Sequence, residues 1–228
     1  MRPRFSFRRE AAIGLGAYGV FLLVRRAVFH DHGRARAHAN AERIVELERR
    51  LGLHLGPPFQ KVLVPRRRLA LCLNWAYVTL NVVLTVGSLA HLFRRKHPDY
   101  HRLRRAAALS MLGAQPVFLL VPTAPPRMLD GFVDTIAEHG GPDLDSGLVV
   151  KLYNPLAAMP SIHVAFAIVT GAGLAAAADG GVARTLAVAY PPAVAATVIA
   201  TGNHYTLDCL AGAVLAAAAL ESARRMDW

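Results

Sequence analysis

The sequence predicts an all-α integral membrane protein, built as a six-helix bundle with an additional amphipathic interfacial helix. Of its 228 residues, 54% are hydrophobic, and the mean hydropathy is positive at +0.33, which is typical of a membrane protein of this length. The apolar residues form six segments separated by polar and basic stretches. Two polar strings, Met159–His163 and Asn203–Asp208, stand beside such segments. Ionisable groups near a membrane span are costly to desolvate and usually mark a site.

The six apolar segments are the expected membrane spans. The first is interrupted by Arg25 and Arg26, whose long side chains can reach the interface if the helix tilts. The last three are rich in alanine and glycine, which let helices pack closely in lipid, so a compact bundle is expected. The segments are residues 11–29, 69–93, 106–122, 161–178, 182–201 and 206–220.

Between the first two spans, residues 41–51 place Ile44, Val45, Leu47 and Leu51 at helical spacing among charged residues. This pattern predicts an amphipathic helix on the membrane surface, or equally a solvated helix within a loop. We therefore divide the chain into residues 1–68, with the first span and the interfacial segment, and residues 69–228, the transmembrane catalytic core. The connection 124–158 is rich in acid, proline and glycine and is expected to be irregular.

The formal charge of +11 is explained by arginines that flank apolar runs and suit anionic headgroups, and we expect no nucleic-acid partner. Cys72 and Cys209 lie in apolar segments and are expected to be packing residues. With six spans, the two membrane faces divide the 26 lysines and arginines equally, so total charge does not set the orientation. The short loop Arg94–Arg105, with six basic residues, favours its face as cytoplasmic. This places both polar strings on the extracytoplasmic face, and we expect a bacterial plasma membrane.

Consecutive spans alternate in direction, so His163, His204 and Asp208 emerge on one membrane face, together with Arg127. His204 and Asp208 are four residues apart and can touch along one helical turn. The carboxylate can fix the imidazole tautomer and leave the other nitrogen as a nucleophile. His204 would attack phosphorus while His163 protonates the departing alcohol, and water or a second alcohol would then cleave the phosphohistidine. Arg127 offers a bidentate guanidinium for the phosphate.

Further candidate phosphate-binding residues are Ser161, Asn154, Tyr153 and Asn203. Ser161 is expected in the first turn of the fourth span, where free backbone N–H groups can hold an anion. Loop hydrogen bonding is the commoner role for the other three. Histidines at helix ends are also usually interfacial hydrogen-bonding residues, and the catalytic interpretation gains weight because the whole set lies on one face.

Two strings resemble a known family. Pro160-Ser161-x-His163 and His204-x-x-x-Asp208 resemble the second and third signatures of the type 2 phosphatidic acid phosphatase superfamily. The integral members of that superfamily have a six-helix membrane core and a histidine-nucleophile phosphotransfer site, usually on the non-cytoplasmic face. The longer strings 122–128 and 153–163 resemble the branch with fungal inositol phosphorylceramide synthase, and 204–208 is similar to the string of sphingomyelin synthases. The resemblance covers roughly residue 69 to the end.

This resemblance implies that His204 is the nucleophile, Asp208 its orienting acid, His163 the acid/base and Arg127 the arginine of the first signature. It implies a histidine-based transfer that uses no cofactor and no metal.

The chain also departs from the general signatures. Leu120 stands at a usual lysine, Met128 at a usual proline, and Thr197-Val198 at a usual Ser-Arg pair. Two phosphate-binding cations of the phosphatase pattern are therefore missing. The synthase-like branch departs from that pattern too, which favours a transferase.

We therefore expect a lipid phosphotransferase or phosphatase that acts on a phospholipid or lipid phosphate through a phosphohistidine. The acceptor is a lipid alcohol or polyol, with inositol phosphate as the transferred group suggested by the resemblance alone, or water. Phosphatidic acid and prenyl diphosphates are candidate substrates in the hydrolytic case. Two alternatives stay open: a metal site of two histidines and a carboxylate, and a non-catalytic lipid-binding or transport protein. The sequence gives no indication of oligomeric state.

Overall fold

The computed structural model describes residues 5–142 and 149–226. Within these ranges every regular element is a helix, apart from an isolated bridge between Thr123 and Ala157. The all-α prediction is confirmed for this part of the chain. The helices are α1 Phe7–Val28, α2 Asp31–Leu51, α3 Gly56–Leu63, α4 Arg67–Trp75, a π-helical turn η1 Ala76–Leu80, α5 Asn81–Arg94, α6 Tyr100–Leu120, a 3₁₀ turn η2 Pro126–Met128, α7 Thr135–His139, α8 Val149–Leu152, α9 Ile162–Ala176, α10 Gly181–Ala200 and α11 Thr206–Arg225.

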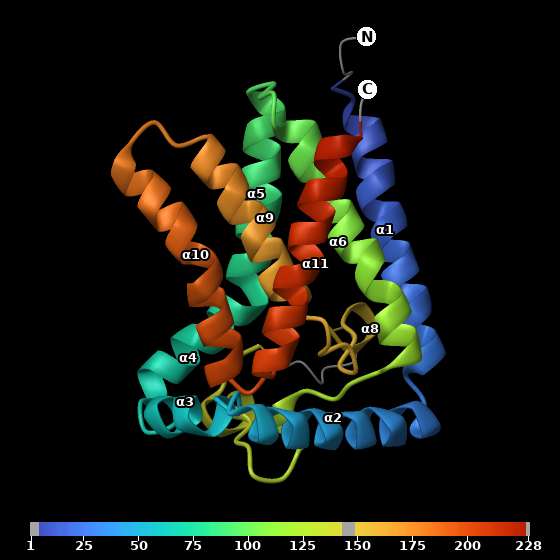
Figure 1. Cartoon of the computed structure of the whole chain (residues 1–228), viewed down its shortest axis with the longest axis vertical. Coiled ribbons are helices and arrows are strands. Elements are labelled where there is room, and N and C mark those ends of the chain that lie inside the picture. Colours follow the sequence, from blue (N-terminus) through green and yellow to red (C-terminus); the bar gives the residue numbers. More distant parts are fainter. Residues whose placement is uncertain (1–4, 143–148, 227–228) are drawn as a thin grey trace.

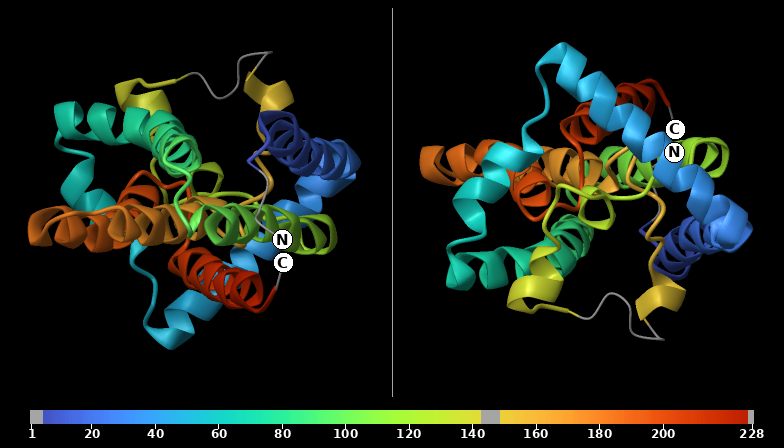
Figure 2. Two further views of the ribbon diagram at one scale, coloured as in Figure 1. Left: turned by 90° about the horizontal axis from the view of Figure 1, so that it is seen from above. Right: turned by 90° about the horizontal axis from the view of Figure 1, so that it is seen from below.

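The long helices form a bundle with α9 at its centre. Helix α9 packs against α5, α6, α10 and α11, and α1 packs on α6 at the edge (Figure 1). Close approach depends on small residues: a Cβ on Gly171 of α9 would lie 2.8 Å from the carbonyl oxygen of Ala187 in α10. Helix α2 lies crosswise beneath the lower end of the bundle, as the view from below also shows (Figure 2).

Several helices are long and apolar enough to cross a membrane, which supports an integral membrane protein. Among the described residues, four stretches meet this description: Phe7–Val28, Arg67–Arg94, Gly181–Ala200 and Thr206–Arg225. Helix α9 is apolar but shorter, and α6 has basic residues in its first turns. Each of the six expected apolar segments falls on a helix of the bundle, but the count of six spans is not confirmed.

Helix α2 is longer than the amphipathic segment that the sequence predicts. It begins where the His30 side chain accepts a hydrogen bond from the Gly33 amide, and it ends at Gly52, whose φ is +69°. Its buried face packs on the loops beside the histidines, whereas Leu47 and Leu51 are exposed. A role of α2 in membrane contact stays a prediction. The buried cluster comprises Ala37, Ala41, Ile44, Val45, Ala124, Leu156 and Tyr205.

Candidate active site

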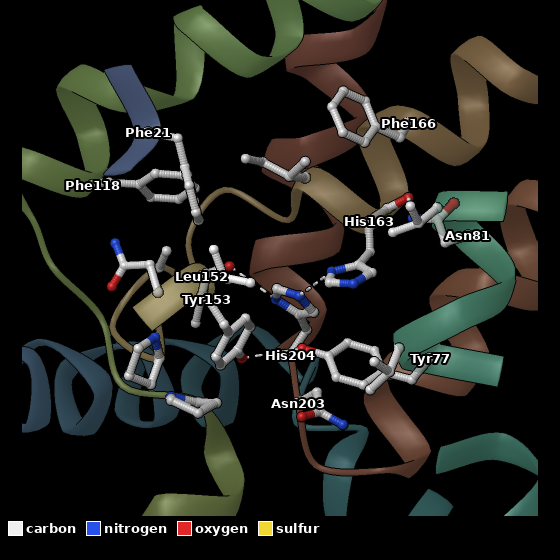
Figure 3. A pocket seen from close by; sticks show the side chains of 18 of the residues that line it. Phe21, Tyr77, Asn81, Phe118, Leu152, Tyr153, His163, Phe166, Asn203 and His204 are labelled. Atoms are coloured by element: carbon white, nitrogen blue, oxygen red, sulfur yellow. Dashed lines mark hydrogen bonds between the residues drawn. The ribbon is translucent and has the colours of Figure 1, made fainter. Parts of the chain in front are cut away.

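His163 and His204 meet at the lower end of the bundle. His163 lies in the first turn of α9, and His204 lies in the short connection between α10 and α11. Nδ1 of His163 is 3.4 Å from Nε2 of His204, and Figure 3 shows the two imidazoles facing each other. The two histidines, 41 residues apart in the sequence, are thus brought into contact.

The other nitrogen of His204 has a partner that fixes the tautomer. Nδ1 of His204 lies 2.9 Å from the carbonyl oxygen of Ala158 and 3.3 Å from Oδ2 of Asp208. Because a carbonyl only accepts, Nδ1 must carry the proton, and the lone pair is therefore on Nε2, toward His163. The His204 side chain is almost fully buried, so its contact with Asp208 is shielded from water that would weaken it.

Asp208 connects the two segments that bear the histidines. Its Oδ2 accepts from the Tyr205 amide at 2.9 Å, and its backbone oxygen accepts from the Ser161 amide at 2.9 Å. Ser161 in turn caps α9, because its Oγ accepts from the Val164 amide. The Ser161 hydroxyl is fully buried and serves this cap, so its predicted role in phosphate binding stays untested.

A cavity of about 250 Å³ opens on the histidine pair. Tyr77 and Tyr153 form its polar end, with their hydroxyl oxygens 3.2 Å apart, and the ring of Tyr77 lies 4.5 Å from that of His163. The rest of the wall is mostly apolar, with Phe21, Phe118 and Phe166 among its side chains (Figure 3). Such a cavity suits a ligand with a polar group at the histidines and a hydrocarbon part beyond it.

Arg127 lies close behind this cavity, outside its lining. Its backbone amide donates to the oxygen of Gly202, two residues before His204, and its Nη1 donates to Asp134 at 3.0 Å. Within the part of the chain that the structure describes, its buried Nε and Nη2 have no hydrogen-bond partner. A buried guanidinium with an unused edge is suited to an anion.

Three other predicted residues, Tyr153, Asn154 and Asn203, line the cavity. Asn154 uses its Oδ1 to accept from the Leu156 amide, while its buried Nδ2 has no partner among the described residues. Asn203 donates to Oγ1 of Thr201 at 2.9 Å. Asn154 is therefore the one of the three with an unused donor.

The sequence reasoning missed Tyr77 and Asn81. The Asn81 side-chain amide donates to the backbone oxygen of His163 and accepts from the hydroxyl of Tyr190, so it fixes the turn that bears His163. A signal existed, because five buried polar residues of the second apolar segment recur at intervals of three and four. They are Asn74, Tyr77, Asn81, Thr85 and Ser88.

Glu48 was also missed, since it looked like a solvent-facing residue of α2. It is buried, and its Oε1 accepts from the Leu207 amide at 2.8 Å, in the first turn of α11. A carboxylate at a helix N-terminus is electrostatically favourable. Burial raises the pKa of Glu48 to about 7.

The positions of His163, His204 and Asp208 bear on the metal alternative. Asp208 lies at Nδ1 of His204, whereas His163 lies at Nε2, on the far side of the ring. The three therefore do not converge on one point. Over residues 5–142 and 149–226, no group of three or more histidines, cysteines or acidic residues is placed to hold a metal ion.

The fold and the site together define the class of protein. It is a helical membrane protein in which His163, His204 and Asp208 form a chain of contacts beside an apolar cavity. The model of the PAP2 superfamily matches residues 42–221, and the chain belongs to this superfamily. Membership suggests a lipid phosphatase or phosphotransferase. No curated protein and no solved structure matches the chain.

Proposed function

We propose that this protein is an integral membrane lipid phosphotransferase in which Nε2 of His204 is the nucleophile. One observation supports this most strongly: the carbonyl of Ala158 and the carboxylate of Asp208 share the proton on Nδ1. The remaining lone pair points at His163, the only other imidazole at the described cavity. An oriented imidazole with a second imidazole beside its free nitrogen is the arrangement that covalent transfer needs.

The reaction has two steps. The N–P bond forms at Nε2 of His204 while the P–O bond to the lipid alcohol breaks, and the alcohol takes a proton from His163. An acceptor hydroxyl then attacks phosphorus, gives its proton to His163 and breaks the N–P bond. In the ligand-free site the two rings are in contact, so they must separate to admit the phosphoryl group.

In this proposal Arg127 and Asn154 donate hydrogen bonds to the negatively charged phosphate, because both have buried N–H groups without partners in the described residues. The asparagine lines the cavity, and the arginine lies behind the loop that bears His204, outside the lining. The resemblance of residues 153–163 to inositol phosphorylceramide synthases favours a lipid or polyol alcohol over water as the acceptor. Hydrolysis is the alternative outcome of the same first step.

The test compares His204→Ala and His163→Ala with His91→Ala, which removes an exposed histidine of α5. The purified proteins are assayed on labelled phospholipids and prenyl phosphates, with and without inositol. We expect His204→Ala to abolish turnover and an acid-labile protein-bound phosphate, and His163→Ala to slow turnover by about 10²–10⁴-fold. His163→Ala should lose far less with a nitrophenyl leaving group, which needs no proton. Wild-type turnover in His204→Ala would refute the mechanism.

A further inference from the structure

A second cavity lies between α1, α5 and α6 and continues the one at the histidines. It has a volume of about 670 Å³, and we call it the α1 groove. Tyr18, Met111 and Phe166 line both cavities, so the two are contiguous. The groove is lined mainly by apolar groups, including Ala11 and Gly14 of α1.

Charged residues also line the groove, toward the N-terminal ends of α1 and α6. Glu10 of α1 and Arg104 of α6 both line it and pair at 3.1 Å, largely buried. From Glu10 to Phe21, which lines the histidine cavity, α1 advances by about 16 Å at the usual helical rise. The two cavities together therefore form an elongated, mainly apolar space along α1, with the histidines near one end and the ion pair toward the other.

Helix α1 also makes hydrogen bonds to the segment that forms one wall of the histidine cavity. The Tyr18 hydroxyl donates to the backbone oxygen of Leu152 at 2.8 Å, and Nε of Arg25 donates to that of Tyr153 at 2.7 Å. Leu152 and Tyr153 both line the cavity, and α8 lies beside α1 (Figure 2). Helix α1 precedes residue 42, where the match to the superfamily begins. The α1 side of this wall therefore lies outside the matched residues.

We propose that one hydrocarbon chain of the lipid substrate lies in the α1 groove while its phosphate is at His204, so that α1 selects lipids with a long chain. This rests on the proposed function and adds the substrate class. Three observations favour the substrate's own chain as occupant: the groove adjoins the histidine cavity at Tyr18, Met111 and Phe166, its wall is mainly apolar, and it extends along α1 away from the histidines.

The groove is expected to act by orientation more than by affinity. Lipid tails are as apolar as the side chains of the groove, so a tail gains little transfer free energy when it leaves the bilayer for the groove. A tail held along α1 instead fixes where the phosphate stands relative to His204, and small displacements there are costly in rate. The effect should therefore appear in kcat as well as in KM.

The chain offers a matched pair of substitutions. Gly14 lines the groove, and a Cβ built on it meets no atom within 4 Å, so the side chain introduced by Gly14→Phe starts in open space at the groove. Gly16 is equally unobstructed but does not line the groove, so Gly16→Phe adds the same side chain elsewhere on α1.

Both variants and the wild type are assayed on dioctanoyl and dipalmitoyl forms of phosphatidic acid and phosphatidylinositol in mixed micelles. We expect Gly14→Phe to lose at least about tenfold in kcat/KM on the dipalmitoyl lipids and little on the dioctanoyl ones. Gly16→Phe should resemble the wild type on both. Equal losses for both chain lengths, or equal behaviour of the two variants, would overturn the groove proposal and leave the proposed function standing. A wild type inactive on every lipid phosphate would instead count against the proposed function.

A second readout does not depend on turnover or on the variants folding. A dipalmitoyl phosphatidic acid with a diazirine in one chain is photolysed with the wild-type protein, and the labelled peptides are mapped. We expect labels on the groove-lining face of α1, and excess unlabelled lipid present during photolysis should reduce their yield. Labelling whose yield excess lipid does not reduce, or which is equal on the outer face of α1, would mean that bulk membrane lipid fills the groove. Either result would refute the proposal.

Discussion

Replacing Gly212 by alanine should disable the site while leaving the fold in place. Gly212 lies in α11, one turn after Asp208. At this point α11 contacts Ser161, the residue that immediately precedes α9. A Cβ at Gly212 would lie 2.3 Å from the backbone oxygen of Ser161. Since ordinary contact begins near 3.4 Å, α9 and α11 must separate locally by about 1 Å.

This separation falls on the segment that positions both histidines. Ser161 is two residues before His163, and its amide donates to the backbone oxygen of Asp208 at 2.9 Å. A shift of about 1 Å stretches that hydrogen bond beyond its normal range, at a cost of about 1 kcal/mol. It also opens the 3.4 Å contact between His163 and His204. Misplacement by 1 Å near reacting groups costs about 10²-fold in rate, so we expect Gly212→Ala to lose about that factor in kcat.

The assay is lipid turnover at saturating substrate, together with size-exclusion chromatography and the apparent Tm in detergent. The matched control is Gly87→Ala in α5, because a Cβ at Gly87 meets no atom within 4 Å. That control should keep full activity. Gly212→Ala with more than about a third of wild-type kcat would refute the argument that this close approach sets the histidine geometry.

Three further outcomes follow from buried charges. The folded-state pKa of Glu48 is about 7, against a usual 4.5. Between these two pH values the folded chain binds more protons than the unfolded chain. The free energy of unfolding therefore falls by about 3 kcal/mol as the pH rises through this range. Glu48→Gln keeps an acceptor for Leu207 and should raise the apparent Tm at pH 8 but not at pH 4; a difference independent of pH would contradict this. Arg127→Lys should lower kcat/KM by about 10- to 100-fold, because an ammonium lacks the planar guanidinium that binds Asp134 through Nη1 and leaves Nε and Nη2 for a phosphate; wild-type kinetics on a lipid phosphate would remove Arg127 from the site. Asp208→Asn leaves the Ala158 carbonyl to hold the Nδ1 proton of His204 but removes the negative charge beside it, so kcat should fall by about 10- to 100-fold, with a small change in Tm as the check that the fold survives.

The histidine pair was predictable because it depends on short-range rules. Alternation of helix direction puts His163 and His204 at one end of the bundle, and a spacing of four residues brings Asp208 to His204. The helices also follow the apolar segments closely, since segment length and hydropathy are local properties of the chain.

The groups that support the pair were less accessible to sequence reasoning. The carbonyl of Ala158 fixes the tautomer of His204, and a backbone group has no signature in the sequence. Glu48 contacts the first turn of α11 across more than 150 residues, and helical periodicity alone does not show which face of α2 will be covered. Asn81 could have been found, because buried polar residues at helical spacing in an apolar segment indicate a partner.

The N-terminal residues contact the region that bears the two histidines. Helix α2 meets the core through Glu48, and α1 holds Leu152 and Tyr153 through Tyr18 and Arg25. The reacting groups all lie within the matched region 42–221, whereas the α1 wall lies before it. Under the two proposals, chemistry and chain selection would therefore reside on different segments. If this separation holds, changes along α1 alter which lipid is used, while the phosphohistidine still forms at His204 with any lipid short enough to avoid the groove.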